Sequence, residues 1–253
     1  MRRRLENIFV EALPLHVSEG GFKYRLAVSV IHTWWLGELF EDYRGIPREA
    51  MYLIYGDFFP ALAFGMFYTD LPYFLSSVRG LSDTYMGTVI MAMGISMVLS
   101  SIPLGIAADR YGRRKFLAIG NVIASLVIIL FSLTAEPAIL ILAAVLEGIA
   151  EAAYSASSSA IIAEKAGAEK RTSVFSLFWV INNVAFGLGG IIIPSVLVFE
   201  SAGFGAGESH MLLYSILGGL GLASTLILLK VSESKTLNRA TSFKDMLPRK
   251  SKA

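Results

Sequence analysis

The 253-residue sequence contains no cysteine and little charge. Without cysteine, the chain can form neither a disulfide framework nor a zinc site built on thiolates. Charged residues make up 17% of the chain and hydrophobic residues 55%, whereas an average soluble domain is about 25% charged. This balance is too apolar for a disordered chain and leaves too little charge to cover a soluble domain. The net charge of +2 gives no reason to expect nucleic acid as a partner.

Most of the apolar residues lie in six long blocks. A helix needs about 20 residues to cross about 30 Å of hydrocarbon. The uncharged stretches between Asp83 and Asp109 and between Arg171 and Glu200 contain 25 and 28 residues. Buried helices of a soluble protein are the alternative, but these tend to be shorter and to carry polar faces, and the blocks lack the alternation of barrel strands. We therefore predict an all-α membrane protein, a bundle of six transmembrane helices at 51–75, 85–107, 116–133, 138–163, 173–199 and 211–229.

The basic residues alternate between the predicted loops. Of the 22 Lys and Arg, 21 fall in segments on one side of the membrane, and Arg79 alone falls on the other. Cytoplasmic loops are the ones enriched in Lys and Arg, so both termini are predicted to lie in the cytoplasm, with the chain in the cytoplasmic membrane. Residues 1–50 then form a cytoplasmic segment, in which Leu5–Leu13 is a helix on the membrane surface or a solvated tail. Residues 51–229 form the membrane domain, and residues 230–253 form a basic cytoplasmic tail.

The loop between the second and third blocks carries a distinctive motif. It runs Gly105-Ile-Ala-Ala-Asp109-Arg110-Tyr-Gly112-Arg113-Arg114-Lys115. We expect Gly105 to allow close packing of the second helix, Gly112 to permit a tight reversal, and Asp109 to pair with Arg113. The loop resembles the G-x-x-x-D-R-x-G-R-R-K signature of the major facilitator superfamily of secondary transporters, and it stands at that family's place after the second span. The resemblance implies that these residues form a gating loop.

The resemblance also has consequences for the architecture. Members of the family have about twelve spans in two six-helix halves, each half being two inverted three-helix repeats whose first helices line the central cavity. This chain resembles the amino-terminal half alone, and residues 230–253 resemble the linker between halves. A second six-helix half is therefore implied, as a separate chain, a second copy of this chain or a missing segment.

Several polar side chains fall inside the predicted spans, where their insertion needs a reason. Glu147 and Glu151 are one helical turn apart and cannot both ionise cheaply, so we predict that they bind a proton or a cationic group. A structural polar pair that bonds neighbouring helices is the alternative. The remaining candidates for substrate or proton binding are Asp70, Tyr154, Asn182 and Asn183.

Other residues are expected to serve packing. Asp57, nearer the cytoplasmic end of the first span, is assigned a structural role, and His210 is expected to be an unrelated surface or interface residue. Small residues recur at four-residue spacing and predict close helix crossings. The three rows are Gly120/Ala124, Gly148/Ala152/Ala156/Ala160 and Ser215/Gly219/Ala223.

The sequence contains no phosphate-binding loop, H-E-x-x-H or G-x-S-x-G motif. We therefore expect no cofactor, no metal site and no enzymatic activity. The predicted function is that of a secondary active transporter, or its amino-terminal half, which moves a small solute across the lipid bilayer by alternating access, with protons as a candidate coupling ion. The alternative is a non-transporting membrane scaffold or truncated remnant, and intramembrane hydrolysis at the Glu147/Glu151 pair is a third.

Overall fold

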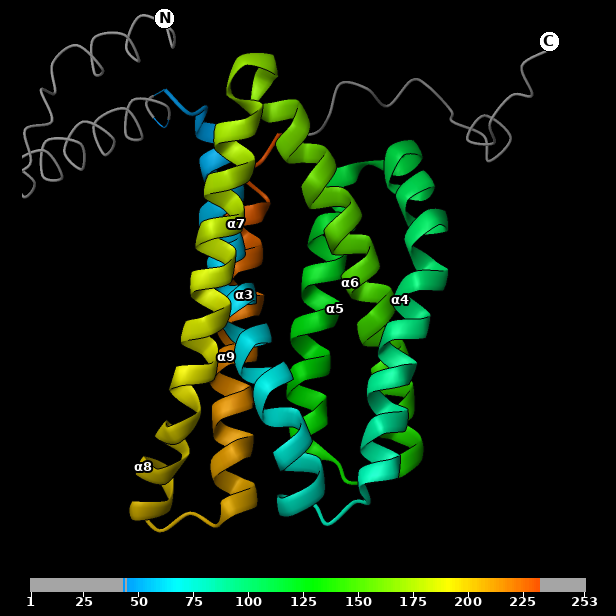
Figure 1. Ribbon diagram of the computed structural model, residues 1–253, viewed down its shortest axis with the longest axis vertical. Helices are drawn as coiled ribbons and strands as arrows, with labels where there is room; N and C mark the ends of the chain where they lie inside the picture. Colours follow the sequence, from blue (N-terminus) through cyan, green and yellow to red (C-terminus); the bar gives the residue numbers. More distant parts are fainter. Residues whose placement is uncertain (1–42, 44, 233–253) are drawn as a thin grey trace, which may run out of the picture. The chain divides into compact units, whose positions relative to one another are not determined.

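The computed structural model describes residue 43 and residues 45–232. The predictions for Leu5–Leu13 and for most of the tail lie outside the described residues. Within them, six helices are long and apolar enough to cross a membrane, which confirms the predicted spans with boundaries that differ by a few residues. These helices are α3 (Arg48–Tyr73), α4 (Asp83–Tyr111), α5 (Arg113–Leu133), α6 (Pro137–Lys165), α7 (Gly167–Ile192) and α9 (Ala206–Leu228) (Figure 1).

Two spanning helices continue into segments of altered helical geometry. The π-helix η1 (Phe74–Val78) continues α3, and the 3-10 helix η2 (Ile193–Ser195) joins α7 to the short helix α8 (Val196–Ser201). Pro72 lies just before η1 and Pro194 lies within η2. Proline lacks the N–H that the helical ladder needs, so a local change in hydrogen-bond spacing is expected beside it.

The contacts among the six spanning helices show a two-fold repeat, in which the first three helices correspond to the last three. α3 packs chiefly against α7 and α9, α6 packs chiefly against α4 and α5, and α5 and α9 pack against each other. Exchanging the first three spanning helices for the last three leaves this pattern unchanged. Because each unit has three spans, the second unit crosses the membrane in the direction opposite to the first. The predicted arrangement of two inverted three-helix repeats is thus present.

Glycine allows the closest of these helix contacts. A Cβ atom on Gly148 of α6 would lie 2.2 Å from the Met93 carbonyl oxygen of α4. This close approach confirms the helix crossing that was predicted from the row of small residues beginning at Gly148. The row through Gly219 was predicted wrongly: nothing lies within 4 Å of a Cβ there, and α9 instead approaches α5 at Gly218 and Gly221. At Gly105 a Cβ would reach only ordinary contact, 3.9 Å from Ala156. Helices apolar on all sides give no sign of which small residues face inward.

Buried hydrogen bonds join α5 to α9. Asn121 of α5 donates from Nδ2 to the Gly221 carbonyl oxygen and to Thr225 Oγ1, each at 2.8 Å. In lipid, helices gain little from apolar burial alone, so such bonds contribute directly to association.

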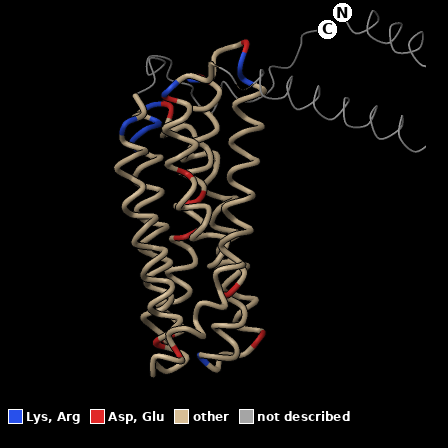
Figure 2. The backbone as a smooth tube through the Cα atoms, turned by 90° about the vertical axis from the view of Figure 1, so that its left-hand side faces the viewer, with Lys and Arg blue, Asp and Glu red and all other residues tan. Residues whose placement is uncertain are grey.

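Charge is distributed along the bundle in a regular way. Figure 2 shows the Lys and Arg of the bundle gathered near one end, while acidic residues also occur halfway along it. The basic end is where α4 meets α5 and α6 meets α7; Arg79, between η1 and α4, belongs to the opposite end.

Candidate functional site

The predicted gating loop is a one-residue reversal between α4 and α5. Gly112 has φ +118°, a conformation that side chains with a Cβ rarely adopt, and its N–H donates to the Ala108 carbonyl oxygen at 2.9 Å. Arg113 then begins α5, and its Nε lies 2.7 Å from Asp109 Oδ1, so the predicted ion pair is present. Arg110 lies over the ring of Tyr111, with its guanidinium carbon 5.4 Å from the ring centroid.

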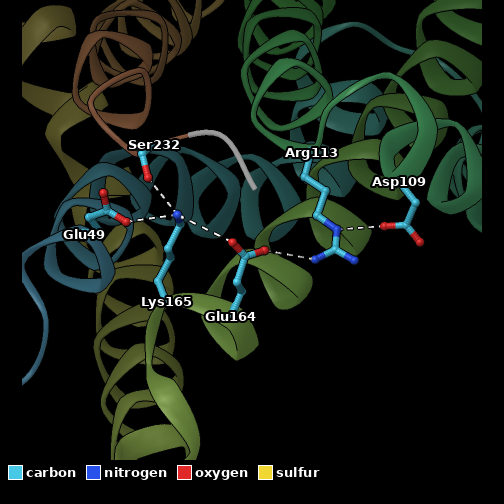
Figure 3. Close-up of polar contacts among 6 residues, drawn as sticks. All are labelled: Glu49, Asp109, Arg113, Glu164, Lys165 and Ser232. Carbon is cyan, nitrogen blue, oxygen red and sulfur yellow. Dashed lines mark hydrogen bonds and ion pairs between the residues drawn. The ribbon is translucent and has the colours of Figure 1, made fainter. Parts of the chain in front are cut away.

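The ion pair is part of a longer network at the basic end (Figure 3). Arg113 Nη1 also lies 3.5 Å from Glu164 Oε2 at the end of α6. The neighbouring Lys165 lies 3.0 Å from Glu49 of α3 and donates to Ser232 Oγ, after α9, at 2.7 Å. One chain of polar contacts therefore joins the ends of α3, α4, α5 and α6 to the residues that follow α9.

The ion pairs of this network are individually weak. Their side chains are partly exposed, between 11% and 40%, and partly exposed ion pairs each contribute about 1 kcal/mol or less. Of the residues in this network, Asp109 and Arg113 were predicted from the sequence, whereas Glu164, Lys165 and Glu49 were not. Glu164 and Lys165 are adjacent, opposite charges at the end of a span, and this pattern could have indicated that they take part in the network.

A second candidate site is a pocket of about 290 Å³ halfway along the bundle. Its walls come from α3, α4, α6 and α7. The lining residues are Asp57, Ala61, Phe64, Tyr68, Met97, Glu151, Tyr154, Asn182 and Phe186. Asp57 lies nine residues into α3 and Glu151 lies fourteen residues before the end of α6, or about 14 and 21 Å from those ends at 1.5 Å per residue. Both depths fall within a hydrocarbon layer about 30 Å thick.

Asp57 is the best-connected group in this pocket. It is 3% exposed. Its Oδ1 accepts a hydrogen bond from the Tyr154 hydroxyl, and its Oδ2 accepts one from Asn182 Nδ2 at 2.7 Å. These bonds join α3 to both α6 and α7. The sequence reasoning assigned Asp57 a structural role and left it out of the candidate set, whereas the structure places it in the pocket wall.

The two glutamates of α6 lie in different environments. Glu151 lines the pocket and makes no hydrogen bond or ion pair with the described part of the chain. Glu147, one turn away, is fully buried, and neither of its side-chain oxygens has a hydrogen-bond partner among the described residues. A buried ionised carboxylate without a partner costs several kcal/mol, so this position accommodates the protonated, uncharged form.

Asp70 and Asn183 lie apart from the pocket. Asp70 Oδ2 is 2.8 Å from His210 Nδ1, and both side chains are almost fully buried, so the prediction that His210 is a surface or interface residue was wrong. The rings of Phe74 and Tyr73 pack against the imidazole. Asn183 is exposed and donates to the Trp179 carbonyl oxygen of its own helix at 2.7 Å.

Of the predicted binding residues, the pocket therefore brings together Glu151, Tyr154 and Asn182, and it leaves out Glu147, Asp70 and Asn183. The residues by which α3 lines the pocket could have been predicted from their spacing in the sequence. Asp57, Ala61, Phe64 and Tyr68 are spaced by four, three and four residues, which puts them on one helix face. Within the described ranges, no three His, Asp or Glu side chains gather as a metal ion would require.

Comparison with known proteins places this architecture in a family. The model of the Major Facilitator Superfamily matches residues 53–251. The chain belongs to this superfamily. The match extends from the first spanning helix through the signature loop and all the remaining spans, so the family resemblance of the loop and the six-helix fold agree.

Curated members of the superfamily differ in the length that they share with this chain. Protein spinster homolog 1 of Xenopus laevis is 32% identical over 155 residues, which is 60% of this chain and 28% of the relative. The D-xylose transporter of Levilactobacillus brevis is 28% identical over 139 residues, 55% of this chain and 29% of the relative. Quinolone resistance protein NorA of Staphylococcus aureus is 22% identical over 201 residues, 79% of this chain and 49% of the relative. The chain thus spans about half or less of these relatives' length.

Proposed function

We propose that this chain is one half of a secondary active transporter, which moves a small solute across the membrane by alternating access. The observation that carries the proposal is the acidic pocket at membrane depth, walled by helices of both inverted repeats. A pocket at that depth, on a six-helix half that can rock against a second half, is the arrangement that alternating access needs. The xylose and quinolone named for two relatives are small molecules, which agrees with this proposal.

The transport path is proposed to be completed by a second six-helix half. The apolar windows of α4 and α7 are 11% and 17% buried, against 44% to 67% for the other four spanning helices. Both helices contribute to the pocket wall. A partner covering them would therefore enclose the pocket, and the greater length of the relatives supports its existence as a separate chain, a second copy or a further segment.

Proton coupling is proposed for the two glutamates of α6. Glu147 has no partner among the described residues that would compensate an ionised form, while Glu151 faces the pocket one turn away. A proton that moves between them would change the charge of the pocket without moving a helix. We further propose that the chain lies in the cytoplasmic membrane with the basic end inside, as the distribution of Lys and Arg supports.

Counterflow in proteoliposomes tests the transport proposal. The full chain is reconstituted alone and as a tandem duplicate, with D-xylose, a quinolone and benzyltrimethylammonium as labelled solutes. We expect counterflow of at least one solute in the tandem form, reduced at least tenfold by Glu151→Gln and unchanged by Glu169→Gln, which removes a charge at the exposed start of α7. Absence of counterflow for every solute in both forms, with correctly folded protein, would favour the non-transporting scaffold.

The same vesicles test proton coupling. With a pH gradient imposed, a transported solute should dissipate the gradient in the unaltered chain but not in Glu147→Gln. Solute flux that is equally independent of the gradient in both forms would overturn the coupling proposal and leave transport intact.

A further inference from the structure

We propose that the pocket between α3, α4, α6 and α7 binds a small organic cation that carries an aromatic or similarly apolar group. This inference rests on the proposed function only in taking the pocket's ligand to be the transported solute. It is drawn from the charge of the pocket, the chemistry of its walls and its size.

The ionisable side chains that line the pocket include two carboxylic acids and no base. Asp57 and Glu151 both line it, and none of its lining residues is Lys or Arg. Tyr154 and Asn182 donate to the two oxygens of Asp57, an arrangement that an ionised carboxylate accepts. Glu151 has no such donor in the described part of the chain. In a medium of low dielectric constant, the ionised form of Glu151 attracts a cation and repels an anion, and a bound cation in turn stabilises that form.

The walls around these carboxylates are aromatic. Phe64 and Tyr68 lie one turn apart on α3 with their rings stacked, their centroids 6.0 Å apart and their planes inclined by 21°. Phe186 approaches from α7 and Met97 from α4. Tyr68 and Phe186 are 38% and 40% exposed, whereas Asp57 is almost fully buried. The rings of Tyr68 and Phe186 therefore stand at the mouth of the pocket, and Asp57 lies at its floor.

This combination selects one ligand chemistry over others. A cation over an aromatic face is attracted by the negative face of the ring, most strongly when water is excluded. A proton needs no aromatic wall, and an inorganic cation such as Ca²⁺ takes six to eight oxygen ligands, whereas the carboxyl groups of Asp57 and Glu151 together supply only four. The volume of about 290 Å³ is at the small end for ligand pockets, so a cation with a single ring fits better than a large drug.

Three benzyl compounds of similar size separate the effect of the ligand's charge from the effect of its size. Benzyltrimethylammonium is cationic, phenylmethanesulfonate is anionic and benzyl methyl sulfone is neutral. Binding is measured by equilibrium dialysis against the full chain in neutral detergent micelles, with empty micelles as the blank. We expect saturable binding of the cation, at least tenfold weaker binding of the sulfone and no saturable binding of the sulfonate.

Variants then assign the binding to the pocket. Asp57→Asn and Glu151→Gln are expected to weaken binding of the cation at least tenfold, while Glu151→Asp restores most of it and Glu169→Gln leaves it unchanged. Phe186→Leu keeps an apolar side chain without the ring and should weaken the aromatic cation about threefold but leave tetramethylammonium unaffected. Size-exclusion profiles establish that each variant is folded.

The outcomes separate this inference from the transport proposal. Binding of the sulfonate as tight as that of the cation, or cation binding that survives both Asp57→Asn and Glu151→Gln, would overturn the inference. Saturable cation binding with no counterflow in any form of the chain would overturn transport alone. Counterflow of a neutral or anionic solute that depends on Glu151, without cation binding, would support transport and overturn the cation pocket.

Discussion

Replacing Gly189 by alanine is expected to force α3 and α7 apart. The new Cβ atom would lie 2.2 Å from the Leu62 carbonyl oxygen and 2.6 Å from the Met66 nitrogen. Both are backbone atoms of α3, so no side-chain rotation can relieve the clash. To reach ordinary contact at 3.4 Å, the helices must separate locally by about 1 Å.

The cost of this separation can be worked from two contacts. Overpacking of this kind costs about 1–3 kcal/mol. The hydrogen bond from Asn182 to Asp57 joins the same two helices two turns away, at 2.7 Å, and stretching it by about 1 Å takes it beyond hydrogen-bond range. Its loss adds about 0.6 kcal/mol, the average for interhelical bonds in a membrane protein. Against this, alanine gains about 1 kcal/mol over glycine in helix propensity. We expect a net loss of about 0.6–2.6 kcal/mol.

Gly187→Ala is the matched control, because it lies two residues away on the same helix and a Cβ there meets nothing within 4 Å. It should be neutral or stabilising by up to about 1 kcal/mol. The free energy of unfolding is measured by titrating each variant in neutral detergent micelles with SDS and following the loss of helical circular dichroism. Equal stability of the Gly189 and Gly187 variants would refute the close approach of α3 and α7.

Three further predictions use the same titration. Asn121→Ala should destabilise the protein by about 1–2 kcal/mol, because two bonds of 2.8 Å to α9 are lost; unchanged stability would mean that these bonds do not hold the helices. His210→Phe should cost about 3 kcal/mol, since it leaves Asp70 buried without the partner 2.8 Å away, and adding Asp70→Leu should restore most of that loss. If the double variant is no more stable than the single one, the pair is not buried as described. A double-mutant cycle on Arg113 and Glu164 should give a coupling below about 1 kcal/mol, because the pair is 3.5 Å apart and partly exposed; a clearly larger value would contradict the weakness of this ion pair.

Much of the architecture could be predicted because it depends on local composition. The length of an apolar block and the charge of the loop beside it are properties of consecutive residues, so the six helices were predictable. The reversal at Gly112 and the pair formed by Asp109 and Arg113 lie within five residues of one another. They were predictable for the same reason.

The candidate site was only partly predictable. Polar residues inside spans could be nominated, but their contacts could not. Asn182 and Asn183 are neighbours in sequence, yet Asn182 bonds to Asp57 across the pocket and Asn183 bonds to its own helix. In spans apolar on all sides, hydrophobic periodicity does not indicate which of two neighbours faces inward.

The sequence by itself determined that this protein is a six-helix membrane bundle with a basic loop that carries the family motif, since each of those features lies in a continuous stretch of residues. Only the tertiary structure decided that Asp57, Glu151 and Asn182 share one pocket, that His210 meets Asp70, and that Lys165 joins Glu49 to Ser232. These groups lie on different helices. The helix rotations that bring them together are set by where glycine lets two backbones touch, and that choice depends on both partners at once.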